Sequence, residues 1–471
     1  MNGPTTNGEA LVPDAPWRRW PWTIPGTDPQ WFTFPEAEGD QGLGATTWFL
    51  EGRLRGRTTG RDLAVMTIFA LNRIVAPFRI ELPAGFHVLA LFDLDAGRYG
   101  TTTGFDLPRP GRVRRAFKLH TTRGLLDVSY DTPVGRSRWS VRRDAGGAPQ
   151  QFRYALDLVG RDGQGRTMEV ELDVDTTKPP APVGGDDLHG VKTCCAQLGT
   201  FSYFQSGLSM RGRVSWGDFV DEVDGDVGWI DRQFAREHFG AYTDLRNTRH
   251  RHEWRVMHLD NGWDLSAWSQ FDAQRGDRLV PFSGVTAQGP DGEVRSTTDF
   301  HVEPLSFVRD PRTIRAQVPL TSGPAWLRDR FHLSVRDWGL SVTADPLVPT
   351  PVHGMPIEYW NGPVRLVGEM AGRPVSGFGF HERSKLWHGP HDLVRVLRET
   401  LSHLPTGGAA GRDARVLADR AWNCDVLLAR GDRAGARRLL AEHVAPGVDR
   451  LPEPGRETAR QVLDDLLAVL R

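Results

Sequence analysis

The chain has 471 residues and a mass of 52.5 kDa, more than one hydrophobic core usually serves, so the length predicts two or three domains. Its 58 Lys and Arg residues nearly balance 59 Asp and Glu residues, and the net charge of -1 argues against nucleic acid or an anionic lipid surface as a partner. The start lacks the apolar core of a signal peptide and no run of about 18 apolar residues follows, so we expect a cytoplasmic protein without an integral membrane segment.

The chain opens with a Pro-rich, aperiodic segment over residues 1–40, which predicts a lead segment that either wraps the first domain or stays mobile. From residue 41 to residue 180, short runs rich in Trp, Phe, Val, Ile and Thr alternate with Gly, Pro and Asp-Gly turns. Residues 168–174 alternate with period two. This pattern predicts an N-terminal β domain.

A Pro- and Gly-rich break over residues 177–185 separates this domain from a second β region, which we place at residues 181–390. Its turn signals include the hairpin sequences Asp260-Asn261-Gly262 and Pro290-Asp291-Gly292. The same strand-and-turn rhythm as before predicts a second β domain of similar kind.

The period changes to that of a helix after Pro390, which predicts a helical domain over residues 391–471. One apolar stripe consists of Leu393, Val394, Val396, Leu397, Leu401 and Leu404. Three further helices are expected near residues 412–429, 433–444 and 456–470, with Asp432 as an N-cap. We interpret this domain as a packing element or as a surface for a protein partner or a second copy of the chain.

A run of alternating histidines over residues 250–258 places His250, His252, Trp254 and His258 on one face of a predicted strand. Metal binding by the first two histidines with a distant carboxylate is one interpretation, but the intervening arginines disfavour a cation. The other interpretation is a solvated edge strand with Trp254 and His258 directed to a pocket. The sequence has no Gly-rich phosphate loop and no Cys-x-x-Cys pair, so we expect neither a metal nor a cofactor.

The motif Gly228-Trp229-Ile230-Asp231-Arg232-Gln233-Phe234 sets an acid beside an indole. In a strand Trp229, Asp231 and Gln233 share one face, while Arg232 lies on the other. Burial beside Trp229 would favour the neutral acid, whereas a close Arg232 would favour the carboxylate. Three interpretations stay open for Asp231: a proton donor, an ordinary ion-paired residue, or a ligand contact.

Several blocks occur in an order and spacing that carry a family resemblance: residues 47–54, 188–190, 202–206, 228–234, and 359–362 together with 374–377. Over roughly residues 42–387 the chain resembles the lipocalin-like family of carotenoid 1,2-hydratases, which also includes AttH proteins, kievitone hydratase and fungal Diels-Alderases. The resemblance implies a mainly β fold with two consecutive lipocalin-like β-barrel or sandwich domains that hold a large apolar ligand.

The resemblance and the motif together predict a cofactor-independent hydratase or cyclase for a hydrophobic unsaturated isoprenoid or polyketide. Asp231 would protonate an alkene, or the apolar pocket would promote a pericyclic ring closure. The alternative is a non-catalytic lipocalin-like carrier of a hydrophobic small molecule. The predicted substrate-binding residues are Trp229, Gln233, Tyr203, Gln205, Trp254, His258, Glu358, Trp360, Trp48 and His87.

Overall fold

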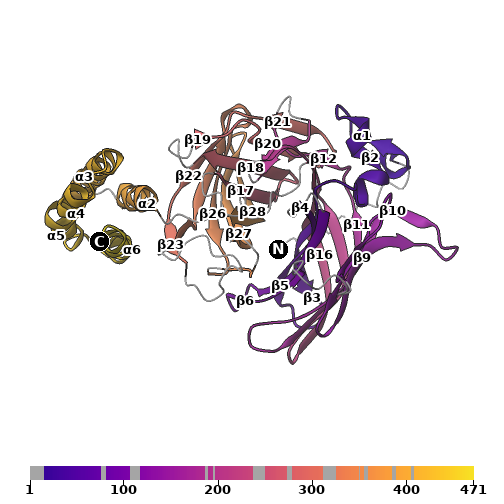
Figure 1. The fold of residues 1–471 in the computed structure, drawn as a ribbon. Coiled ribbons are helices and arrows are strands. Elements are labelled where there is room, and N and C mark those ends of the chain that lie inside the picture. The colour runs from indigo at the N-terminus through magenta and orange to yellow at the C-terminus, as the bar shows by residue number, and fades with distance from the viewer. Residues whose placement is uncertain are drawn as a thin grey trace, which may run out of the picture. The chain divides into compact units, whose positions relative to one another are not determined.

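The computed structural model describes residues 15–75, 81–106, 117–185, 189–194, 197–236, 250–272, 278–310, 325–349, 351–354, 359–384, 389–404, 408–453 and 455–471. The chain divides into two compact units. The first comprises Met1–Lys192, Gln197–Gly240 and Thr286–Arg295, and the second comprises Thr193–Ala196, Ala241–Val285 and Ser296–Arg471. The fold is mainly β with a small helical C-terminal part, which confirms the predicted fold class (Figure 1).

The lead segment packs against the first unit over its described residues. It forms short elements, namely η1 (Pro16–Arg18), β1 (Trp22–Thr23), α1 (Pro29–Phe32), β2 (Thr33–Phe34) and η2 (Glu36–Glu38). Trp31 stacks on Phe201 with ring centroids 4.9 Å apart, and Phe34 lies edge-on to Tyr203 at 5.0 Å. These aromatic contacts bury the segment, so of the two expectations the structure shows the wrapped arrangement.

The first unit is a strongly curved antiparallel sheet. Its strands are β3 (Ala45–Gly56), β4 (Asp62–Val75), β5 (Glu81–Asp93), β6 (Arg98–Asp106), β7 (Leu119–Thr121), β8 (Asp127–Thr132), β9 (Gly135–Arg143), β10 (Pro149–Arg161), β11 (Thr167–Thr176), β12 (Ala181–Pro182), β13 (Val191–Cys194), β14 (Gln197–Gln205), β15 (Leu208–Trp216) and β16 (Phe219–Ala235). The order is β6-β5-β4-β3-β16-β15-β11-β10-β9-β8-β7, and β14 pairs with β16 beside this path. Contacts of β8 with β4 and of β10 with β5 and β6 show that the sheet curls around one core.

The alternating sequence pattern of residues 168–174 corresponds to alternating burial along β11. Met168, Val170, Leu172 and Val174 are buried in the core and the residues between them are exposed. The expected domain boundary near residue 180 falls inside the first unit, because β14, β15 and β16 pair into the same sheet as β3. The strand that carries the Asp231 motif is therefore central to the first sheet.

The other large sheet is also antiparallel, and it carries most strands of the second unit together with residues 286–295, which belong to the first unit. Its strands are β17 (His250–Leu259), β18 (Asp264–Asp272), β19 (Arg278–Leu279), β20 (Gly284–Gln288), β21 (Val294–Thr297), β22 (His301–Pro304), β25 (Phe331–Val335), β26 (Leu340–Pro346), β27 (Tyr359–Met370) and β28 (Arg373–Ser384). The order is β21-β20-β18-β17-β28-β27-β26-β25-β22, and β23 (Phe307–Arg309) pairs with β24 (Trp326–Arg328) apart from it. β17 lies between β18 and β28, so the expectation of an edge strand there is wrong.

The C-terminal helices confirm the period of 3.6 residues. They are α2 (Pro390–Ser402), α3 (Gly408–Ala429), α4 (Arg433–Leu439), the π-helix η7 (Leu440–Val444), α5 (Ala445–Val448) and α6 (Gly455–Val469). The predicted stripe of α2 is buried, and Asp432 caps α4 by accepting from the amide of Gly435. Asp465 of α6 accepts from Trp326 Nε1 at 3.0 Å and from Arg309 Nε at 2.8 Å, so the helices pack on β23 and β24.

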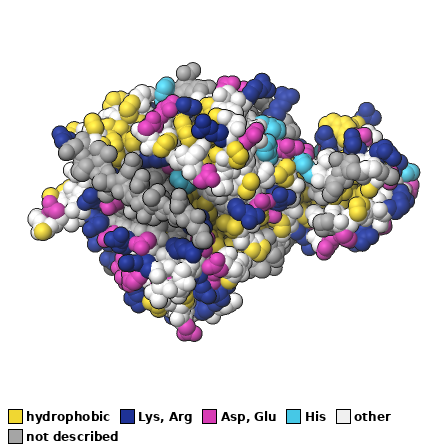
Figure 2. Space-filling view, turned by 180° about the vertical axis from the view of Figure 1, so that it is seen from behind, with side chains coloured by type: hydrophobic (Ala, Val, Ile, Leu, Met, Phe, Trp, Pro, Cys, Tyr) yellow, Lys and Arg dark blue, Asp and Glu magenta, His cyan; other side chains and the backbone are white. Residues whose placement is uncertain are grey.

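Charged side chains of both signs are interspersed over the face shown in Figure 2, as expected from the balanced composition. Within the described residues, none of the helices combines the length and the apolar character needed to cross a membrane.

Candidate functional site

Strand β16 divides the residues of the motif between two faces. Asp231 lies opposite Phe49 of β3 and Phe204 of β14. The neighbouring Arg232 lies opposite Trp48 and Tyr203 on the same strands. Since side chains alternate along a strand, Trp229, Asp231 and Gln233 share one face, here called the Asp231 face. Ile230, Arg232 and Phe234 point to the other face, here called the core face, where Ile230 joins the main hydrophobic core.

The Asp231 carboxyl group is fully buried, and two neutral side chains of the described region donate to it. Ser202 Oγ donates to Oδ1 at 2.9 Å, and Gln233 Nε2 donates to Oδ2. Trp229 is also fully buried on this face, and the cross-strand neighbours of Asp231 are aromatic. A carboxyl group with apolar neighbours and neutral hydrogen-bond partners can carry or release a proton, which is what general acid catalysis needs.

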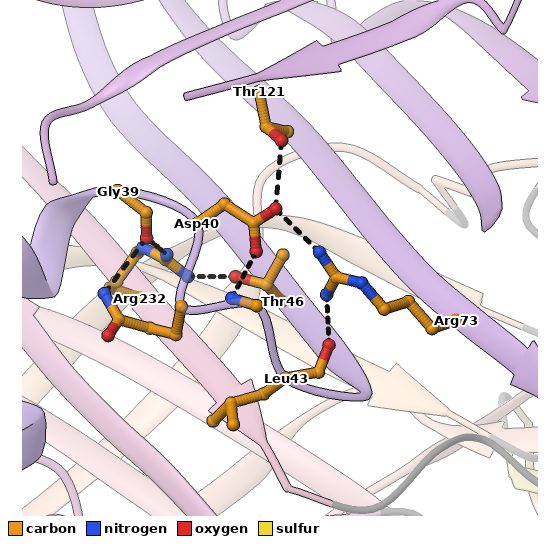
Figure 3. A network of polar contacts seen from close by, with 9 residues as sticks. Gly39, Asp40, Leu43, Thr46, Arg73, Thr121 and Arg232 are labelled. Atoms are coloured by element: carbon orange, nitrogen blue, oxygen red, sulfur yellow. Dashed lines mark hydrogen bonds and ion pairs between the residues drawn. The ribbon is translucent and has the colours of Figure 1, made fainter. Parts of the chain in front are cut away.

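The Arg232 guanidinium is engaged on the core face, where Figure 3 shows its contacts with Gly39 and Thr46. It donates to Thr46 Oγ1 at 2.7 Å, to the carbonyl oxygens of Thr47 and Gln233 at 3.0 Å each, and to those of Glu38 and Gly39. Its Cζ lies 4.3 Å from the centroid of the Trp48 ring. Burial lowers the pKa of Arg232 to about 10. These contacts hold the Arg232 side chain on the face opposite to Asp231, which is the orientation that the interpretation of Asp231 as a proton donor requires.

A second arginine fixes the end of the lead segment. Asp40 accepts hydrogen bonds from Arg73 Nη2 at 2.8 Å, from Thr121 Oγ1 at 3.1 Å and from the amide of Gly42 at 2.9 Å (Figure 3). Arg73 also donates to the carbonyl oxygen of Leu43. The turn after η2 is therefore tied to β4 and β7, next to the carbonyl groups that Arg232 binds.

Glu38 is an acidic group that the sequence analysis missed, because it lies in the aperiodic segment 1–40. It is fully buried, and burial raises the pKa of its carboxyl group to about 8. The Tyr154 hydroxyl lies 2.6 Å from Glu38 Oε1 and 3.0 Å from Gln205 Oε1, and Thr176 donates to the same Gln205 oxygen. A phenol has one proton and an amide oxygen only accepts. The Tyr154 hydroxyl donates to Glu38 Oε1, the nearer of the two oxygens, and this hydrogen bond opposes the rise in the pKa of Glu38 that burial causes.

Four of the predicted substrate-binding residues lie on the core face and not with Asp231. Trp48 Nε1 donates to the Glu38 carbonyl oxygen at 2.8 Å, and Tyr203 donates to the carbonyl oxygen of Ala37 at 3.4 Å. Together with Gln205 these residues surround Glu38. His87 packs on Phe69 at 4.5 Å between centroids, and burial lowers its pKa to about 3, so it is neutral.

Predicted site residues of the second unit divide between the two faces of its sheet. His252, Trp254 and His258 share one face, here called the His252 face, as the spacing predicts. Trp254 donates to Ser266 at 2.9 Å, and His258 Nδ1 lies 2.8 Å from Asp264 Oδ1. Trp360, whose register partner is Arg383, lies on the opposite face. Glu358 and the side chain of His250 lie outside the described residues.

The His252 face carries a buried acid-base cluster. His252 Nε2 lies 2.9 Å from Glu382 Oε1, and its Nδ1 lies 2.7 Å from Ser384 Oγ. Tyr359 donates to the other Glu382 oxygen at 2.8 Å, and Trp268 stacks on the imidazole at 4.9 Å. Strand alternation in the sequence predicted the face on which His252 lies. Its partners come from β27 and β28, and they could be identified only once the pairing register of these strands with β17 was known. In the part of the chain that the structure describes, no three His, Cys, Asp or Glu side chains form a metal-binding group.

Two consecutive curved antiparallel sheets with a buried acid on a central strand define a lipocalin-like double-β protein. The AttH-like family model matches residues 26–382, and the chain therefore belongs to the AttH-like family. This confirms the resemblance predicted from the motifs.

Two solved structures show the same fold. An AttH-like protein of Nitrosomonas europaea is 19% identical with a TM-score of 0.56, and the match covers 77% of this chain and 98% of that one. Kievitone hydratase of Nectria haematococca is 13% identical with a TM-score of 0.53, over 78% of this chain and 98% of that one. Comparison with curated protein sequences gives no match. At these identities the likeness establishes the fold alone.

Proposed function

We propose that the chain is a cofactor-independent enzyme of the hydratase or cyclase kind, acting on a hydrophobic unsaturated isoprenoid or polyketide with Asp231 as the proton donor. The observation that carries this proposal is that Asp231 and Arg232 lie on opposite faces of β16. Asp231 is buried with aromatic cross-strand neighbours, while Arg232 is bound by oxygen atoms on the opposite face. Kievitone hydratase has the same fold, so the fold accommodates such chemistry.

The reaction begins with transfer of the Asp231 proton to one alkene carbon. A C–H bond forms from the alkene electron pair, the adjacent carbon becomes a tertiary cation, and the O–H electron pair stays on Asp231. Ser202 and Gln233 donate to the two oxygens of the resulting carboxylate, and the Trp229 ring provides an aromatic face that tolerates positive charge. Attack by water followed by return of a proton gives hydration, and attack by a second alkene gives a ring.

The product depends on whether water or a second alkene reaches the cation. A pericyclic ring closure at the same site would require no proton. The substrate class is best found by extracting the purified full chain and identifying bound lipid-soluble compounds by mass spectrometry. Turnover of that compound in D2O then separates the mechanisms. Acid catalysis incorporates one deuterium at the protonated carbon, whereas a pericyclic reaction incorporates none and a carrier returns the ligand unchanged.

Asp231→Asn tests the proton donor directly. We expect turnover to fall by about 10²- to 10⁴-fold while ligand affinity changes little, because the amide keeps the shape but has no acidic proton. The matched control is Asp173→Asn on β11 of the same sheet, whose exposed side chain pairs with Arg142 and should leave turnover unchanged. Normal turnover by Asp231→Asn would exclude the acid mechanism.

A further inference from the structure

The face of the second sheet opposite His252, here called the Arg255 face, carries a buried group of basic side chains. Glu253 and Arg255 of β17 have Arg383 and His381 of β28 as register partners. Arg328 of β24 reaches the same place, since its Nη1 lies 3.2 Å from Glu253 Oε1. The exposed fractions are 0% for Arg255 and His381, 1% for Glu253, 4% for Arg383 and 7% for Arg328. Charged side chains are rarely buried to this degree unless they are paired.

Glu253 is shared among more cations than one carboxylate can neutralise. Its Oε1 accepts from Arg328, while its Oε2 accepts from Arg255 and lies 3.5 Å from His381 Nε2. Arg383 donates instead to the carbonyl oxygen of Arg328 at 2.6 Å. Asp329 acts on Arg383 electrostatically, but burial raises the pKa of the Asp329 carboxyl group and so weakens that compensation. The described residues thus contain an excess of buried positive charge, which costs free energy unless an anion balances it.

Several donors of this group are buried without a hydrogen-bond partner among the residues that the structure describes. They are Nε of Arg255, Nε of Arg383 and the ring nitrogen that carries the proton in the neutral imidazole of His381. Burial, together with Arg328 and Arg383, holds the pKa of Arg255 well below its usual value, and burial and the same arginines lower that of His381. A buried donor without an acceptor destabilises the folded state, so the concentration of such donors at one place indicates a missing acceptor.

Aromatic rings flank these donors. Arg255 Cζ lies 4.7 Å above the Phe331 ring, and the His381 ring meets Phe331 edge-on at 4.6 Å. Arg383 Cζ lies 6.0 Å from the Trp360 ring. Phe331 belongs to β25, which is separated from β17 by β28, β27 and β26, so the sheet curls around the Arg255 face. The guanidinium groups are therefore held in place before any ligand binds.

We propose that Arg255, Arg383 and His381 form a binding site for an oxyanion, a carboxylate or phosphate group, within the second β unit. Planar guanidinium groups recognise such groups through paired N–H donors. The anion comes either as a free ion or as the head group of an apolar ligand, for which the aromatic walls are suited. The residues differ from those around Asp231, so this inference does not depend on the proposed function.

Thermal unfolding of the full chain tests the site with inorganic phosphate, acetate or decanoate, at constant ionic strength against chloride. A bound anion should raise Tm saturably, because it stabilises only the folded state. A response to phosphate or acetate identifies a free anion as the ligand, and a response to decanoate alone identifies a carboxylate head group on an apolar chain. The absence of a saturable response to all three would overturn the proposal.

Variants locate the response. Arg383→Met should weaken the apparent affinity for the effective anion by at least about tenfold, the scale of one lost charged contact. Arg365→Met is the matched control, because Arg365 lies on β27 of the same sheet with its side chain 64% exposed. Arg383→Lys keeps the charge and the fold but lacks Nε, and should weaken binding less than Arg383→Met. Equal responses in the chain with Arg383→Met and in the unaltered chain, or equal losses with Arg365→Met, would contradict the site.

Discussion

The two β units bury guanidinium groups in different ways. In the first unit, Arg232 is surrounded by hydroxyl and carbonyl oxygens and lies beside Glu38, a carboxyl group whose pKa burial raises to about 8. In the second unit, Arg255 and Arg328 share Glu253, and Arg255 and Arg383 keep unused donors within the described region. A cation bound by fixed protein dipoles is part of the structure, whereas a cation with unused donors is ready to bind a ligand.

The largest effect that this comparison predicts is for Arg232→Met. The change leaves the oxygens of Thr46, Thr47 and Gly39 without their donor, at about 1–3 kcal/mol each, so we expect a loss of about 5 kcal/mol in the free energy of unfolding. Urea unfolding measures it, with the exposed Arg211→Met on β15 as the control. The loss should be the same in phosphate and in chloride. If phosphate restored the stability of the Arg232→Met variant, the first unit would also contain an anion-binding site, and the two units would not differ in this respect.

Glu253→Gln should destabilise the second unit by about 3 kcal/mol in chloride, because it removes the carboxylate that two buried arginines share. Part of that loss should return in the anion that raises Tm of the unaltered chain, since a bound anion replaces the missing charge. Urea unfolding in the two buffers provides the measurement. An equal loss in both would remove the distinction between the units.

Glu38→Gln tests whether the acid beside Arg232 is neutral. The pKa of Glu38 rises from 4.5 to about 8 in the folded chain, so the folded state binds more protons between these values and stability falls as pH rises through them. The slope from this residue approaches about 1.4 kcal/mol per pH unit in that window. The amide cannot ionise, so the difference in unfolding free energy between the variant and the unaltered chain should grow from pH 5 to pH 8. A constant difference would mean that Glu38 is ionised throughout.

The smallest expected effect is that of Ser202→Ala, which removes one of the neutral donors to Asp231. We expect a loss of about 1 kcal/mol in stability, with a slower proton transfer if Asp231 is the acid. Ser215→Ala on β15, which removes a donor to Glu169, is the control for stability alone. If both variants changed turnover equally, the effect of Ser202→Ala on the rate could not be attributed to its hydrogen bond with Asp231.

Strand parity predicted the faces of Asp231 and Arg232, because β16 pairs without interruption from Val227 to Ala235. The alternation of side chains within one strand does not show which residues of the neighbouring strand lie on the same face of the sheet. The register that sets Tyr203 against Arg232 put Tyr203 and Gln205 on the core face, and the register of β3 did the same for Trp48. Long-range pairing determines that register, and the sequence has no local signal for it.

The alternating histidines of residues 250–258, with arginines between them, led to the prediction of a solvated edge strand. The pattern is equally that of a central strand with a charged, buried face, and only the strand order distinguishes the two. The helices were predictable because their apolar stripe repeats over a few turns and needs no distant partner. Glu38 had neither a periodic pattern nor a neighbouring partner in sequence.

The contact between the lead segment and Arg232 has a consequence for the order of events during synthesis. Glu38 and Arg232 are 194 residues apart, so at about 5–20 residues per second the ribosome needs about 10–40 s to supply the second after the first. Trp31 lacks its contact with Phe201 of β14 for most of that interval, and its contact with Phe234 of β16 until after it. The described part of the lead segment is therefore synthesised early but is among the last parts of the first unit to complete its contacts.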